Sequence, residues 1–163
     1  MAITVAVDTY LSVADADAYW LLRNDSVWSA ATTAEKEAAL VVATQYIDGA
    51  YSFIGEVTNY TQSLAFPRAS LEIRSGNFKG VYYSSTTIPP QIEAATAELA
   101  LEALSGTLEP SQSRGGAIKR EKVDVIEVEY MDFAPSGKTF NYVSRILSPL
   151  TKGSQNTVML ART

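Results

Sequence analysis

The chain has 163 residues, of which 47% are hydrophobic and 19% are charged, and its formal net charge is −5. This composition is typical of one globular domain and is too apolar for a disordered chain. The sequence has no cysteine and no histidine, which excludes disulfide bonds, thiolate metal sites, and catalysis by Ser-His-Asp or Cys-His groups. We therefore expect a protein that is not an enzyme and that uses no cofactor and no metal.

Three stretches of the first 105 residues have apolar residues at helical spacing, and each has a start signal. Ser12 and Thr32 are each followed three residues later by an acidic residue, which is the spacing of a capping box. Pro89 and Pro90 suit the first turn of the third stretch. In the first stretch Leu21 and Leu22 widen the apolar stripe. We expect helices near 12–23, 33–48 and 89–105.

The segment between the second and third of these helices, 50–87, has no periodicity. It is rich in Tyr, Ser, Thr, Asn and Gly, so we expect a long, largely irregular loop. A loop of this length is uncommon inside a compact domain and usually has a function. We expect residues 1–110 to form a helical bundle domain that includes this loop.

Residues 111–150 are expected to form a linker, a β element and a short helix that ends before Pro149. The β-branched, alternating stretch VDVIEVEYM predicts a strand near 122–130. Its alternation changes phase midway, which indicates a bulge or burial of both faces. On this interpretation Val123 and Val125 share one face, and Ile126, Val128 and Tyr130 share the other.

The C-terminal residues 151–163 are expected to form an extended arm. They contain Lys152 and Arg162 but no acid, and their one apolar cluster is Val158-Met159-Leu160. Such a segment cannot offset the entropy of folding alone and suits folding on a partner. The predicted fold class is mainly α: a small helical bundle with a β-strand or hairpin element and an extended C-terminal arm.

Charge is unevenly distributed along the chain, with −8 over 1–110 and +3 over 111–163. Lys119, Arg120 and Lys122 form a basic cluster that could contact DNA or a partner, although a solvated linker is the simpler interpretation for an acidic protein. The carboxylates near this cluster lack the convergent groups of a catalytic site. The start of the chain lacks a signal peptide, and no run of residues is apolar enough to span a membrane, so we expect a cytoplasmic origin and no membrane partner.

Several segments, taken in order, resemble one family: TYLSVADADAYW, AEKEAALVVATQYIDGAY, LAFPRA, IPPQIEAATAELALEAL and GGAIKREKVDVIEVEY. They resemble the DnaT-like single-stranded-DNA-binding protein family, whose members are similar to head–tail connector proteins of tailed phages, also called adaptor or head-completion proteins. The resemblance covers roughly residues 8–150.

The resemblance implies a subunit of an oligomeric ring, commonly of twelve copies, that docks below the portal, extends the DNA channel and joins head to tail. Its expected partners are further copies of itself, the portal protein, another neck or tail protein, and genome DNA that passes without sequence-specific binding. It would reside in the neck of the virion, and in the host cytoplasm during assembly. The alternative is a DnaT-like protein that binds single-stranded DNA in replication.

The expected portal or subunit contacts follow from these features. Strand residues would pair with a β element of a neighbouring subunit, and arm residues would dock on the portal or an adjacent subunit. They are Val123, Val125, Ile126, Val128, Tyr130, Lys152, Val158, Met159, Leu160 and Arg162.

Overall fold

A computed structural model of the chain describes residues 3–74, 80–108, 120–123, 126–129 and 140–152. Within these ranges the fold is mainly α, as predicted, with small antiparallel β elements. The helices are α1 (Val13–Leu21), α2 (Ser26–Ala30), α3 (Thr33–Ala50), α4 (Pro90–Ser105) and α5 (Asn141–Leu147). The strands are β1 (Glu56–Val57), β2 (Arg68–Ala69), β3 (Arg120–Val123) and β4 (Ile126–Glu129).

The predicted start signals cap the helices as expected. The Ser12 hydroxyl accepts a hydrogen bond from the Asp15 amide at 3.1 Å. Thr32 and Glu35 form both bonds of the capping box at the start of α3. Helix α2 was not predicted, because five residues are too few to show a period. Its local signal is Asp25, whose carboxylate caps it by accepting the Trp28 amide at 2.8 Å.

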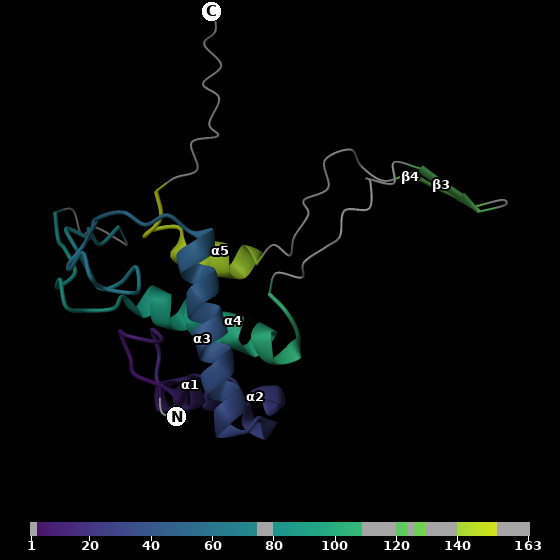
Figure 1. Cartoon of the computed structure of the whole chain (residues 1–163), viewed down its shortest axis with the longest axis horizontal. Helices are drawn as coiled ribbons and strands as arrows, with labels where there is room; N and C mark the ends of the chain where they lie inside the picture. The colour runs from purple at the N-terminus through teal and green to yellow at the C-terminus, as the bar shows by residue number, and fades with distance from the viewer. Residues whose placement is uncertain (1–2, 75–79, 109–119, 124–125, 130–139, 153–163) are drawn as a thin grey trace, which may run out of the picture.

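The core is built where α3 crosses α4, with α1 and α2 at one end of α3 and α5 near the other (Figure 1). Small residues such as Ala43 and Ala95, both fully buried, let the two helices approach closely. The short helix α5 packs on α4. Its Val143 and Leu147 belong to the same buried cluster as the residues of α1, α3 and α4.

The long loop is irregular, as predicted, but aromatic and polar contacts fix it to the bundle. Phe66 is fully buried, and its ring packs edge-on against Tyr10 at 5.8 Å and Phe53 at 4.8 Å between centroids. The Asp48 carboxylate on α3 accepts the Ala65 amide at 3.0 Å and the Tyr10 hydroxyl. These contacts join the N-terminal segment, α3 and the loop at one point.

Arg68 ties the same loop together through backbone carbonyls. Its guanidinium donates to the carbonyl oxygens of Ile54 at 2.8 Å, Gly55 at 2.7 Å and Ala65 at 3.2 Å. Gly55 has a φ of +74°, and a Cβ there would lie 2.6 Å from the Ala69 carbonyl oxygen. Glycine is therefore required where β1 meets β2.

The single strand expected near 122–130 is wrong, and the hairpin form of the expected β element is confirmed. β3 and β4 form an antiparallel hairpin whose register pairs Val123 with Ile126 and Glu121 with Val128. Directly paired residues lie on the same face of an antiparallel sheet, so Val123, Ile126 and Val128 share one face rather than opposite ones. The phase change in the sequence marks the reversal of the chain, not a bulge.

We expect Phe66→Ala to lower the free energy of unfolding by about 3–5 kcal/mol, because it removes a large, fully buried ring. The matched control is Tyr60→Ala in the same loop, where the side chain is 94% exposed and the expected change is within about 0.5 kcal/mol. Urea denaturation followed by circular dichroism measures both. Equal destabilisation by the two variants would contradict the proposed anchoring of the loop.

Candidate assembly surfaces

The β3–β4 hairpin is amphipathic by register. The pairs Arg120–Glu129 and Lys122–Glu127 occupy one face, and the alternate pairs, Glu121–Val128 and Val123–Ile126, occupy the other. The first face therefore has two oppositely charged pairs at facing positions, and the second has three β-branched apolar residues together with Glu121. An apolar face of this kind is normally covered in a folded protein.

Among the described residues, each strand of this hairpin pairs only with the other. Figure 1 shows the hairpin lying apart from the helices. A two-stranded hairpin alone is at best marginally stable in water and needs a third strand or a packed surface. The β3–β4 hairpin is therefore the first candidate surface for contact with another chain.

The hairpin register also bears on the basic cluster. Arg120 and Lys122 occupy positions opposite Glu129 and Glu127, so two of its three cations face carboxylate positions. Lys119, Val125 and Tyr130 lie outside the described residues. Because acidic residues occupy the paired register positions, the cluster is a weaker candidate for binding phosphates than the sequence suggested.

At the C-terminus, the structure places only the start of the expected arm. Thr151 forms an antiparallel bridge with Phe53, and the Lys152 amide donates to the Ser52 carbonyl at 2.8 Å. These two residues are therefore fixed beside the C-terminal end of α3. Val158, Met159, Leu160 and Arg162 lie outside the described residues.

A second candidate surface, which the sequence did not indicate, is a groove at the end of the bundle where α1 meets α2. We call it the α1–α2 groove. It has a volume of about 480 Å³ and is lined by Asp17, Ala18, Trp20, Leu21, Asn24, Asp25, Trp28, Ser29 and Lys36.

The predicted burial of Leu21 and Leu22 is wrong: α1 ends at Leu21, and the two side chains are 81% and 86% exposed. Val27 on α2 is also half exposed.

The polar side of the groove is a compact network. The Asp17 carboxylate oxygen Oδ1 accepts the Trp28 indole N–H at 2.7 Å and the Lys36 ammonium at 2.8 Å. The Lys36 side chain is only 12% exposed, and its Nζ lies 5.5 Å from the Trp28 ring centroid. Partial burial raises the pKa of Asp17, but the hydrogen bonds from Lys36 and Trp28 outweigh it and lower the pKa below its ordinary value of 3.8.

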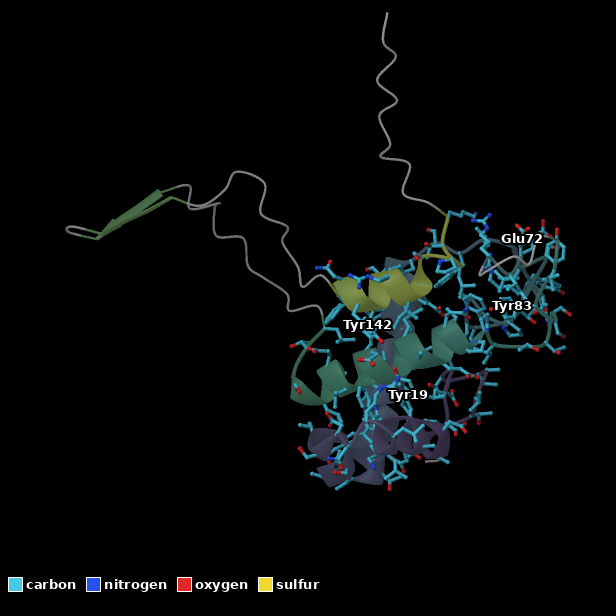
Figure 2. All side chains as sticks on the ribbon, turned by 180° about the vertical axis from the view of Figure 1, so that it is seen from behind. Tyr19, Glu72, Tyr83 and Tyr142 are labelled. Atoms are coloured by element: carbon cyan, nitrogen blue, oxygen red, sulfur yellow. The ribbon has the colours of Figure 1, made fainter. Side chains whose placement is uncertain are left out.

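Other cations of the bundle are also engaged. Arg23 stacks over the Tyr19 ring at 3.5 Å from the centroid and lies 4.0 Å from Glu98. Burial and a 2.8 Å hydrogen bond to Glu98 raise the pKa of Tyr19. Figure 2 shows Tyr19 on α1 and Tyr142 on α5 at either side of α4. Arg74 pairs with Glu72 at 3.8 Å.

We also searched the described residues for membrane-spanning helices and for metal-binding groups. None of its helices is both long and apolar enough to cross a membrane. Across those same residues, no group of three acidic, histidine or cysteine side chains could hold a metal ion.

Comparison with known protein families shows which family the chain belongs to. Residues 2–163 match the family described as "Putative DnaT-like ssDNA binding protein". The chain belongs to this family. The match spans the bundle, the hairpin and the C-terminal segment alike, and it confirms the family resemblance drawn from the sequence. No curated protein and no solved structure matches the chain.

The Asp17 network gives a test that depends on pH. A carboxylate whose pKa is lowered by folding adds stability above its ordinary pKa and loses it as the pH falls through the lowered value. We expect wild type to exceed Asp17→Asn in unfolding free energy at about pH 6, with the difference shrinking at about pH 3. Urea denaturation at the two values measures it. A difference that is unchanged or larger at the lower pH would contradict the network.

Proposed function

We propose that this member of the DnaT-like family is a structural subunit of a tailed-phage head–tail connector. It would form an oligomeric ring below the portal, commonly of twelve copies, extend the DNA channel and join the head to the tail. The protein would be a component of the virion neck and would have no enzymatic activity. The observation that carries the proposal is the amphipathic β3–β4 hairpin, whose apolar face requires a cover.

In this proposal the helical bundle forms the folded body of each subunit, and the β3–β4 hairpin forms the contact with the next subunit. The bundle closes its own core, whereas the hairpin has three apolar register positions and no strand partner among the described residues. Pairing with a β element of the next subunit would supply backbone hydrogen bonds and bury that face. Such an interface repeats from copy to copy, which is what a closed ring needs.

The charge of the bundle fits a channel through which DNA slides. Residues 1–110 carry −8, and most cations of the described bundle are held by carboxylates, a ring or backbone carbonyls. An acidic surface repels the phosphate backbone and does not hold it. Genome DNA would pass such a surface without sequence-specific contacts.

The hairpin test uses DNA-filled heads that lack this protein. We expect Val128→Asp to abolish stable attachment of the purified chain to such heads, because it places a charge on the apolar face of the hairpin. Glu127→Asp, on the charged face, is the matched control and should attach like wild type. Co-sedimentation of chain with heads measures occupancy. Attachment of Val128→Asp at the wild-type level, or failure of the wild-type chain to attach, would contradict the proposal.

The alternative, single-stranded-DNA binding in replication, is favoured by the description of the family. Its best site is α5, where Tyr142 is 54% exposed and Arg145 follows one turn later. Binding without sequence preference needs a continuous basic groove with stacking aromatic residues. One aromatic residue and one arginine on a seven-residue helix fall short of that requirement.

We expect negligible affinity for a labelled single-stranded oligonucleotide at physiological salt, measured by fluorescence anisotropy. Tyr142→Ala and Arg145→Ala should therefore leave the signal unchanged. Submicromolar binding that weakens steeply with added salt would place replication ahead of the connector role.

A further inference from the structure

The α1–α2 groove has the features of a peptide-binding site. Both tryptophans of the chain line it. Among the described side chains, the Trp20 indole N–H is the one buried polar group without a hydrogen-bond partner, although Trp20 is only 5% exposed. A buried donor left unpaired costs about 1–3 kcal/mol. Because this N–H has almost no solvent-accessible surface, a backbone carbonyl entering the groove would accept it only after the Trp20 ring shifts.

The rim of the groove defines the chemistry of its occupant. Leu21 is 81% exposed at the edge, so an apolar side chain is needed to cover it. Asp17 and Asp25 line the same groove, and the one cation there, Lys36, is already bound to Asp17. The matching ligand is a short apolar segment with a positive charge and no acid.

We propose that the α1–α2 groove binds residues 153–163 of a second copy of this chain. This segment, GSQNTVMLART, contains one apolar triplet, Val158 to Leu160, one cation, Arg162, and no carboxylate side chain. The triplet covers Leu21 and the indole rings, and Arg162 faces the two aspartates. The inference rests on the proposed assembly function and names a second surface, besides the β3–β4 hairpin, by which neighbouring copies are joined.

The length of chain after Lys152 favours binding of residues 153–163 to the groove of a second copy over binding to the groove of the same chain. Lys152 is fixed to Ser52, just beyond the C-terminal end of α3, whereas Lys36 lines the groove near the N-terminal end. From Lys36 to Ala50, α3 rises about 21 Å. Six residues from Lys152 to Val158 span at most about 22 Å when fully extended. The chain's own Val158 would meet the groove only along a nearly straight path, whereas a neighbour's triplet has no such restriction.

An interface of this kind is head-to-tail, since each copy offers a groove to one neighbour and an arm to the other. Such contacts close into a ring when the rotation between copies allows it. They also permit a complementation test, because the two halves of the contact can be broken in different copies.

The test uses two full-length variants. Leu21→Asp disables the groove and leaves the arm, and Met159→Asp disables the arm and leaves the groove. Leu21 is exposed, so its replacement spares the core. With Val128→Asp added to both chains to remove pairing through the hairpin, we expect neither variant to self-associate in sedimentation velocity, and we expect their mixture to form one-to-one dimers and nothing longer. Val42→Asp, a 44% exposed position on α3 outside the groove, is the matched control and should assemble like wild type.

A labelled peptide of residues 153–163 gives the direct binding measurement. We expect saturable binding to the full chain by anisotropy, a change in tryptophan emission on the same curve, and at least a tenfold loss of affinity for Leu21→Asp. The inference is overturned if the peptide fails to bind at about 1 mM, or if both variants assemble like wild type. It is also overturned if Met159→Asp shifts the tryptophan emission of dilute monomer, since the chain's own arm would then fill the groove. Attachment to heads remains a separate readout, so the connector role can survive each of these results.

Discussion

The partly buried Asp48 carboxylate is the contact on which the rest of the bundle depends. It accepts hydrogen bonds from the Tyr10 hydroxyl and the Ala65 amide, and the Tyr10 oxygen in turn accepts the Phe66 amide at 3.3 Å. Burial raises the pKa of both Asp48 and Tyr10. Because one carboxylate holds α3, the N-terminal segment and residues 65–66 of the long loop together, this part of the loop closes the core.

Two surfaces outside this core, the β3–β4 hairpin and the α1–α2 groove, have groups that lack a packing or hydrogen-bond partner among the described residues. The hairpin has apolar residues at the register positions Val123, Ile126 and Val128. The α1–α2 groove is lined by the exposed Leu21 and by Trp20, whose buried indole N–H has no hydrogen-bond partner. A chain evolved only to be a stable monomer would gain by burying these groups. Their persistence is most simply explained if other copies or other proteins cover them, which is why the proposals above concern assembly and not chemistry.

The sequence predicted the elements whose signals are local. Thr32 with Glu35 and the Pro89-Pro90 pair located two helices, because capping and proline geometry act within a few residues. It failed where the outcome depended on distant parts of the chain. The alternation near Val125 fitted a bulge as well as a reversal, and only the pairing of Val123 with Ile126 distinguishes them. Leu21 widens the apolar stripe in the sequence, but it lies one turn after Asp17 and Ala18, which are both exposed. The α1–α2 groove joins residues of three helices, so no contiguous motif announces it.

The central claim is that the β3–β4 hairpin is covered only when the chain assembles. Amide hydrogen exchange measures this directly, since backbone protection reports local opening. In dilute monomer the amides of Arg120–Val123 and Ile126–Glu129 should exchange far faster than those of α3 and α4, and assembly on heads should slow them to the range of the core helices. Equal and strong protection of the hairpin in monomer and assembly would contradict the account.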